Sequence, residues 1–148
     1  MIISRTPFRV SFFGGGTDYP AWYSKNGGAV LATSIDKYCY ISCRKLPPFF
    51  PCKHRIVYSI IESVTKNKEI KHPVVREVFE WMRVSEGLEV HHDGDLPARS
   101  GLGSSSSFTV GLLNALYASL GSIVSKERLA KEATFVEQEL VGDYVGCQ

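Results

Sequence analysis

The chain of 148 residues has the length of one ordinary domain and can bury a hydrophobic core. Its composition, 44% hydrophobic and 22% charged, is that of a globular protein, and its net charge of +2 is too small to indicate a nucleic-acid or acidic-membrane surface. No apolar run approaches the roughly 20 residues that span a bilayer, and the N-terminus lacks a signal-peptide pattern. We therefore expect a cytoplasmic protein that binds neither nucleic acid nor membrane.

The first part of the chain is rich in β-branched and aromatic residues, which favours strands. The predicted strands are residues 2–5, 9–13, 29–35, 38–44 and 55–59. Pro7 is expected to break the first pair, and Asp36 with Lys37 to form a turn in the second. The stretch 46–51 (LPPFFP) cannot be a central strand, because proline removes donors from the hydrogen-bond ladder.

The later part of the chain shows mainly helical spacing of apolar residues. Pro73 is expected to open a first helix that runs on until Gly87, and residues 88–92 alternate as a half-buried strand does. A second helix is predicted over residues 104–120, with Gly121 after its C-terminal end. Ser125 should cap a third helix. The apolar face of this third helix consists of Leu129, Ala133, Val136 and Leu140.

Strands come early and helices late, which predicts a single α+β domain over residues 1–148 with a mixed or antiparallel sheet. The four cysteines show no CxxC pairing, so reduced structural thiols are expected over a zinc site. The adjacent pair His91 and His92 would point to opposite faces of a strand, and the histidines are assigned no role.

The loop at residues 100–107 (SGLGSSSS) lies between a predicted strand and a predicted helix. Glycines let its backbone turn tightly, and the following serines start the helix, where unpaired N–H groups and the positive end of the dipole favour a phosphate. It is not a Walker loop, since no lysine lies between Glu89 and Ser125. Spacing alone leaves open a flexible turn with a helix cap.

A second glycine cluster, Gly14 to Gly16, also follows a predicted strand, and Thr17, Asp18 and Tyr19 come directly after it. An aspartate after such a turn can accept hydrogen bonds from sugar hydroxyls. The alternative is a solvent-exposed turn with a local side-chain hydrogen bond.

Taken together, the two loops resemble two motifs of the GHMP kinases. Residues 5–19 (RTPFRVSFFGGGTDY) resemble the first motif of that superfamily, and residues 95–106 (DLPARSGLGSSS) resemble its proline-led phosphate loop. Within the superfamily, the GGGTDYP sequence and residues 72–77 (HPVVRE) are most similar to D-glycero-D-manno-heptose phosphate kinases and fucokinase-like sugar kinases. Gly15 and Gly16 stand where galactokinases have Glu and His, which argues against galactose-type recognition.

The resemblance implies an α+β fold like ribosomal protein S5 domain 2, and transfer of the ATP γ-phosphate to a sugar or sugar-phosphate hydroxyl, foremost the anomeric one. Arg9 would lie beside the transferred phosphate. Mg²⁺ would be bound by Ser105 and Glu137, with Glu139 as the alternative to Glu137. The implied ATP-binding residues are Pro97, Ser100, Gly101, Leu102, Gly103, Ser104, Ser105, Ser106 and Ser107. The implied sugar-binding residues are Gly15, Gly16, Thr17, Asp18 and Tyr19.

The resemblance also implies a catalytic aspartate directly after Gln148 and a C-terminal domain, neither of which this sequence contains. The chain is therefore expected to be an inactive N-terminal fragment, with apolar surface that invites dimerisation. Two other hypotheses stay open: a non-catalytic nucleotide- or sugar-binding module, and a kinase of the same superfamily for another small molecule such as fucose or galactose.

Overall fold

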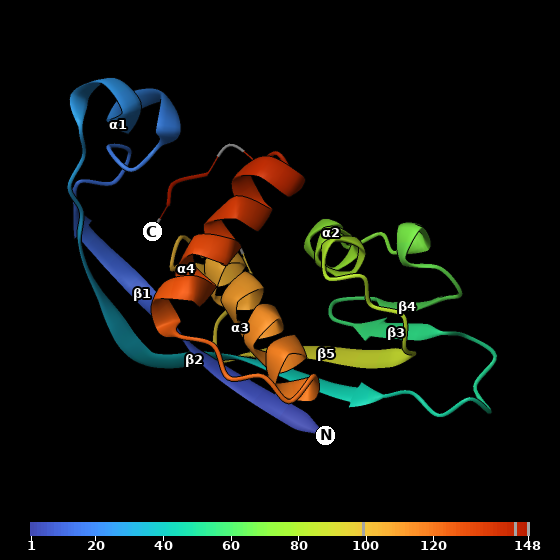
Figure 1. The fold of residues 1–148 in the computed structure, drawn as a ribbon. Helices are drawn as coiled ribbons and strands as arrows, with labels where there is room; N and C mark the ends of the chain where they lie inside the picture. Colours follow the sequence, from blue (N-terminus) through green and yellow to red (C-terminus); the bar gives the residue numbers. More distant parts are fainter. Residues whose placement is uncertain (99, 144, 148) are drawn as a thin grey trace.

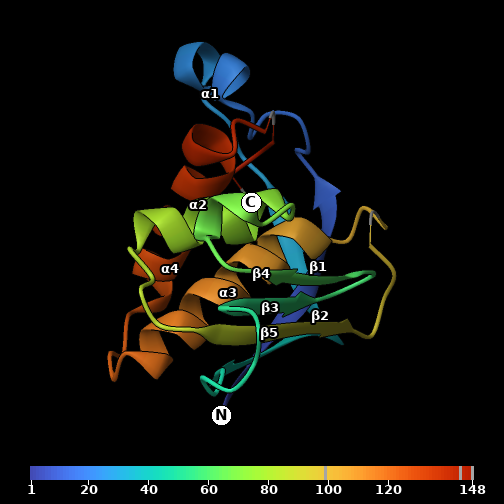
Figure 2. The same cartoon turned by 90° about the vertical axis from the view of Figure 1, so that its right-hand side faces the viewer.

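The computed structural model describes residues 1–98, 100–143 and 145–147. The longer helices lie on one face of a five-stranded sheet, giving a two-layer architecture, and a short helix after the first strand lies beyond the end of that strand (Figure 1 and Figure 2). The strands are β1 (Ile2–Phe13), β2 (Leu31–Lys45), β3 (His54–Val57), β4 (Ile61–Val64) and β5 (Leu88–Gly94). Their order is β1-β2-β5-β3-β4, and only the β3–β5 pair among these strands is parallel. This confirms the predicted α+β class and mixed sheet.

The helices follow the expected pattern, with an additional short one between the first two strands. They are α1 (Pro20–Asn26), α2 (Pro73–Trp81), α3 (Ser104–Ser119) and α4 (Lys126–Phe135), and α4 continues into a π-helical segment (Val136–Leu140). Ser125 caps α4 as predicted, since its side chain accepts from the Arg128 N–H. None of the described helices is long and apolar enough to cross a membrane.

Two predicted interruptions in the sheet are wrong. Pro7 does not break β1, because β1 is an edge strand, where a missing N–H costs little. Asp36 and Lys37 do not form a turn between strands. The register shifts at this point, so that Pro7 pairs with Tyr38 but Arg9 pairs with Ser34, and the extra residues form a bulge within β2.

The sequence pattern did not reveal strand β4, because it carries a charged residue on its buried side. Glu62 is buried while Ile61 is exposed. The carboxylate of Glu62 accepts hydrogen bonds from the N–H groups of Lys71 and His72 and from the Tyr58 hydroxyl, at 2.6, 3.0 and 2.7 Å. Burial alone would raise the pKa of Glu62, but these donors outweigh it and lower the pKa.

Helix α2 begins at Pro73 as predicted but ends well before Gly87, where the sequence pattern placed its end. Its last helical residue is Trp81, and Arg83 then adopts a positive φ of 53°, which takes the chain out of the helix.

Strand β5 presents its two neighbouring histidines to opposite faces, as expected. His92 packs edge-on against Phe108 of α3, whereas His91 lies 3.1 Å from Glu89 on the other face. Glu89 is nevertheless buried, because Arg44 and Arg55 from the adjacent strands also pair with its carboxylate. The alternating sequence pattern therefore predicts correctly which face of β5 each side chain occupies, but it does not predict that Glu89 is buried.

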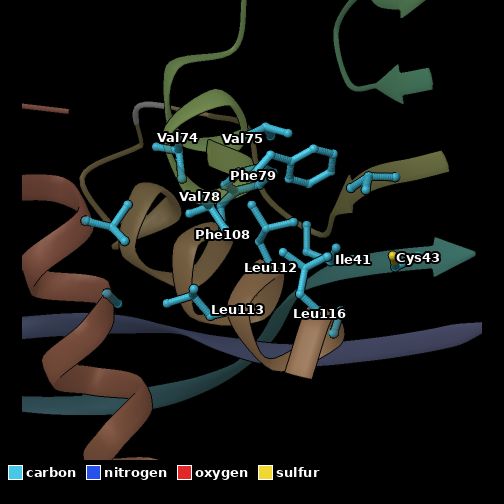
Figure 3. Close-up of a cluster of buried hydrophobic side chains, with 14 of the residues drawn as sticks. Ile41, Cys43, Val74, Val75, Val78, Phe79, Phe108, Leu112, Leu113 and Leu116 are labelled. Atoms are coloured by element: carbon cyan, nitrogen blue, oxygen red, sulfur yellow. The ribbon is translucent and has the colours of Figure 1, made fainter. Parts of the chain in front are cut away.

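The core lies between the sheet and the helices, with α3 at its centre (Figure 3). The labelled side chains are Ile41, Cys43, Val74, Val75, Val78, Phe79, Phe108, Leu112, Leu113 and Leu116. Burial raises the pKa of Cys39 to about 12 and that of Cys43 to about 11, so both remain thiols. All four cysteines of the chain are free.

Helix α3 is fixed tightly onto β1 and β2. A Cβ on Gly111 would lie 3.1 Å from Ile41 Cγ1, so only glycine allows this approach without displacing a neighbour. Ser4 Oγ donates to the Gly111 carbonyl at 2.7 Å, and Ser107 Oγ donates to the Pro7 carbonyl at 3.0 Å. These contacts hold the start of α3 at a set place beside β1.

The loop before α3 is held by backbone contacts to the same strand. Gly101 and Gly103 have φ angles of 76° and 78°, in the left-handed region that favours glycine. The Arg9 N–H donates to the Leu102 carbonyl at 3.0 Å. A Cβ on residue 103 would lie 2.9 Å from Arg9 Cγ, whereas a Cβ on residue 101 would meet nothing within 4 Å.

Shortening Leu112 to alanine is expected to lower the free energy of unfolding by about 3 kcal/mol, because Leu112 is fully buried and its removal leaves a cavity. The matched control is Leu120→Ala at the end of the same helix, where the side chain is 67% exposed and the expected loss is below about 0.5 kcal/mol. Urea unfolding followed by circular dichroism measures both. Equal losses would contradict the central place of α3 in the core.

Gly103→Ala should destabilise the chain more than Gly101→Ala. Both substitutions incur the cost of a left-handed alanine, about 1–2 kcal/mol, but only residue 103 also meets the Arg9 side chain. Denaturant unfolding of the two variants measures the difference, and adding Arg9→Ala to Gly103→Ala should remove most of it. If Gly101→Ala costs as much as Gly103→Ala, the contact with Arg9 does not constrain the loop.

Candidate functional site

A cavity of about 530 Å³ opens where the start of α3, the turn after β1 and the segment after the π-helical turn meet. Its lining residues are Arg9, Gly15, Gly16, Asp18, Tyr19, Gly101, Gly103, Ser104, Ser105, Ser106, Glu137, Val145 and Gly146. The structure thus brings together members of both predicted loops with Arg9 and Glu137. Val145 and Gly146 were not predicted as site residues, although they lie just before the position after Gln148 where the resemblance implies a catalytic aspartate.

The start of α3 supplies the anion-binding side of this cavity. Gly103 occupies the N-cap position and has no side chain that could accept from the first-turn N–H groups. The helix that follows is 16 residues long, so its positive dipole end lies at Ser104, Ser105 and Ser106, all of which line the cavity. This geometry suits a phosphate group.

Four of the predicted loop residues lie elsewhere. Pro97 and Ser100 are exposed outside the lining of the cavity, and the Leu102 side chain packs against the hydrophobic core. Ser107 is buried, and its hydroxyl is directed to the Pro7 carbonyl of β1. These residues shape and anchor the loop, while the glycines and the three preceding serines face the cavity.

Glu137 is the carboxylate that meets the start of α3. Its side chain is buried, and its Oε1 accepts hydrogen bonds from Ser105 Oγ at 2.9 Å and from Thr109 Oγ1 at 2.8 Å. Glu139 is exposed and lies outside the cavity lining, so the geometry favours Glu137 of the two acidic candidates. Sequence reasoning missed Thr109, although its position four residues after Ser105 places it on the same face of α3.

Asp18 is the second carboxylate of the cavity. It is 5% exposed, and its Oδ1 accepts from the Gly16 N–H at 2.9 Å in a tight local turn. Gly146 packs so closely on the other side that a Cβ there would lie 1.8 Å from Oδ2. The Cys147 N–H donates to the Asp18 carbonyl at 3.2 Å, which ties the end of the described chain to this turn.

Thr17 stabilises the predicted sugar loop from within, unlike its neighbours, which line the cavity. Its hydroxyl donates to the Gly14 carbonyl at 2.8 Å and accepts from the Ala29 N–H at 3.2 Å. It therefore closes the base of the turn and does not line the main cavity. Gly15, Gly16 and Tyr19 do line it.

Charges of both signs line the cavity. Arg9, whose side chain packs over Gly103, is the cation among the described lining residues, and Asp18 and Glu137 are the anions. His72 and His92 lie against Phe108 outside this lining, and burial is the main cause that lowers the pKa of each. These histidines are therefore neutral near pH 7 and add no charge close to the helix start.

The oxygen donors at the helix start fit the Mg²⁺ that the resemblance implies. Ser105 Oγ and Glu137 Oε1 are 2.9 Å apart, and both residues line the cavity. Mg²⁺ prefers oxygen ligands and takes one or two carboxylates together with substrate phosphates and water. Among the described residues there is no cluster of three His, Cys, Asp or Glu side chains that would form an all-protein metal site.

Comparison with known proteins supports a kinase relationship. A family model described as the N-terminal domain of GHMP kinases matches residues 61–148. A curated relative, D-glycero-alpha-D-manno-heptose 7-phosphate kinase of Campylobacter jejuni, is 29% identical over 156 residues, which cover 99% of this chain and 46% of the relative. The chain thus spans about half the length of that relative.

Solved structures share the fold at low sequence identity. A D-glycero-D-manno-heptose 1-phosphate kinase from Bacteriodes thetaiotaomicron matches with a TM-score of 0.85 and 21% identity, over 100% of this chain and 51% of that one. Galactokinase from Lactococcus lactis in complex with galactose matches with a TM-score of 0.73 and 20% identity, over 98% and 40% of the two chains. Since the family model covers more than half of the sequence, this chain belongs to the GHMP kinases and has the fold of their N-terminal domain.

Proposed function

We propose that this chain forms the ATP-binding half of a sugar kinase, which transfers the γ-phosphate of ATP to a hydroxyl of a sugar phosphate. The observation that carries the proposal is the meeting of the α3 start, Arg9, Glu137 and Asp18 around one cavity of about 530 Å³. A phosphate-binding helix start and a buried carboxylate that can accept from hydroxyls are the two halves that phosphoryl transfer to a sugar needs.

The nucleotide side would be the loop before α3. The N–H groups of Ser104, Ser105 and Ser106 would donate hydrogen bonds to the phosphate oxygens. Gly101 and Gly103 let the backbone approach the phosphates closely. Ser105 and Glu137 would hold Mg²⁺, which when bound neutralises charge on the transferred phosphate. Arg9, which packs over Gly103 at the same helix start, would contribute its positive charge beside the phosphates.

The acceptor side would be the turn after β1. Asp18 is fixed from both sides, by the Gly16 N–H and by the close packing of Gly146, so its carboxylate has a set direction in which to accept a hydrogen bond from a sugar hydroxyl. Tyr19 and the two preceding glycines would complete this wall. The rate enhancement would come from holding donor and acceptor in line, since phosphoryl transfer asks mainly for positioning and charge stabilisation.

The substrate class we propose is a heptose phosphate with transfer to its anomeric hydroxyl. The support is the relatedness to heptose phosphate kinases, together with the Gly15–Gly16 pair that departs from the galactokinase motif. A GGGTD turn without side chains at these positions leaves more room for an acceptor larger than a hexose.

Substitution of Glu137 by Gln is expected to weaken binding of Mg²⁺·ATP by about tenfold, because the negative charge that would bind Mg²⁺ is lost. Ser105→Ala should weaken it by a smaller factor. Ser122→Ala, an exposed serine beyond the end of α3, is the control and should bind as the wild type does. Isothermal titration calorimetry with and without EDTA measures these affinities. A wild-type chain that binds no nucleotide at millimolar concentration would overturn the nucleotide assignment.

The sugar assignment has its own assay. The full-length kinase of which this chain would form one half is incubated with Mg²⁺·ATP and D-glycero-D-manno-heptose 7-phosphate, fucose or galactose, and the products are followed by ³¹P NMR. This chain alone is expected to show no turnover. We expect a new anomeric phosphate on the heptose phosphate alone, and its loss in Asp18→Asn with nucleotide affinity retained. Nucleotide binding without phosphorylation of any sugar in the panel would instead identify a binding module.

A further inference from the structure

Thr109 is a fully buried residue near the start of α3, and no motif of the sequence marks it. Its side chain is 0% exposed, yet it carries a hydroxyl that must find a hydrogen-bond partner inside the protein. The Oγ1 atom lies 2.8 Å from Glu137 Oε1 and 3.1 Å from the carbonyl oxygen of Ser105. Thr109 therefore stands directly behind the carboxylate that faces the cavity.

The two acceptors of this hydroxyl differ in strength. A threonine inside a helix ordinarily donates to the carbonyl four residues earlier, which here is that of Ser105. The Glu137 carboxylate is closer and carries a charge, so it makes the stronger hydrogen bond. The backbone carbonyl then remains as a second acceptor, so Thr109 stays hydrogen-bonded when the carboxylate shifts.

The backbone around Glu137 is shaped to bring its side chain to this place. Residues 136–140 form a π-helical turn, in which the Val141 N–H bonds to the Val136 carbonyl at 2.9 Å. Val136 is fully buried in the core and Glu137 is 5% exposed, so two successive side chains both point inward. Such wide turns are rare in helices and concentrate at functional sites.

Both hydroxyl donors reach the same carboxylate oxygen. Ser105 Oγ and Thr109 Oγ1 lie 2.9 and 2.8 Å from Glu137 Oε1. Ser105 lines the cavity and is exposed, so it can release this bond to a ligand, whereas Thr109 lies behind it in the core and cannot. The first hydrogen bond is thus open to exchange with a ligand in the cavity, whereas the second is shielded from it.

We propose that Thr109 is a positioning residue, whose hydroxyl holds the Glu137 carboxylate toward Ser105 and the cavity in readiness for a divalent cation. The inference rests on the proposed function for the identity of that ligand. Without the Thr109 hydroxyl, the carboxylate would be only loosely held and would have to be ordered when the cation binds. Cation affinity should then fall, while the affinity for nucleotide without a divalent cation stays the same.

The test uses Thr109→Val, which keeps the shape and the β-branch but removes the hydroxyl, and Thr109→Ser, which keeps the hydroxyl. Mn²⁺ serves as the probe, and its binding in the presence of saturating ADP is measured by the loss of the free-ion signal in electron paramagnetic resonance. We expect Thr109→Val to weaken Mn²⁺ binding by about tenfold. Thr109→Ser should restore it to within about twofold of the wild type. ADP affinity in EDTA should be equal in all three proteins.

A double-mutant cycle separates positioning from a general loss of structure. In a Glu137→Gln background, Thr109→Val should cause little further loss of Mn²⁺ affinity, because the group that it positions is gone. Thermal unfolding checks that each variant is folded. If Thr109→Val does not fold, Thr109→Ala makes the same deletion with a better helix former and takes its place in the cycle.

The outcomes are distinct for the two proposals. A wild-type chain that binds Mn²⁺·ADP and a Thr109→Val variant that binds it equally well would overturn the role of Thr109 and leave the proposed function standing. Equal losses in Thr109→Val and Thr109→Ser would likewise overturn it, since the hydroxyl would then not be the group that matters. A wild type that binds no Mn²⁺·ADP would overturn the proposed function, and this inference with it.

Discussion

The close packing of α3 on the two long strands is the contact on which the rest of the site depends. At Gly111 the helix approaches the sheet so closely that a Cβ would lie 3.1 Å from Ile41 Cγ1, and the hydroxyls of Ser4 and Ser107 join the two elements on either side. Because the start of α3 is fixed in this way, its N-cap residue Gly103 lies beside Arg9 of β1. A helix end that is held rigidly can receive a charged ligand without first being ordered.

The fold class and the positions of most helices could be predicted from the sequence, because they depend on local features of the chain. The apolar spacing of α3, Pro73 at the start of α2 and Ser125 before α4 each give a helix its position. The errors arise where a distant contact overrides a local rule. Pro7 is harmless only because β1 lies at an edge, and Glu62 can be buried because Lys71 and His72, just before α2, donate their N–H groups to it.

The site follows the same division. The glycines that need positive φ, the serines at a helix start and Asp18 after a turn all carry local signatures, and the structure gathers them around one cavity. Thr17 and Ser107 have the same local signatures but do not face the ligand site, because their hydroxyls donate hydrogen bonds to the backbone carbonyls of Gly14 and Pro7. Which of two serines faces a ligand depends on what lies behind the helix, and that information is tertiary.

Thr109 and the Gly146 contact illustrate what tertiary structure adds to a motif. Neither residue belongs to a glycine loop, yet one lies behind a cavity carboxylate and the other lies against the second one. The two carboxylates of the cavity are thus each fixed by a residue that the chain supplies from another segment.

The meeting of Asp18 with Gly146 and Cys147 places the C-terminal end of the described chain beside the turn after β1, as Figure 1 shows near the C-terminal label. Contacts so far apart in sequence form late, because the entropy of closing so long a loop must be offset by structure already in place. Arg9 and the helix start come from β1 and α3, whereas the acceptor side is completed by Gly146 and Cys147, which follow them in the sequence. Because synthesis runs from the N-terminus, a growing chain carries the nucleotide loop before it carries the residues that complete the acceptor side.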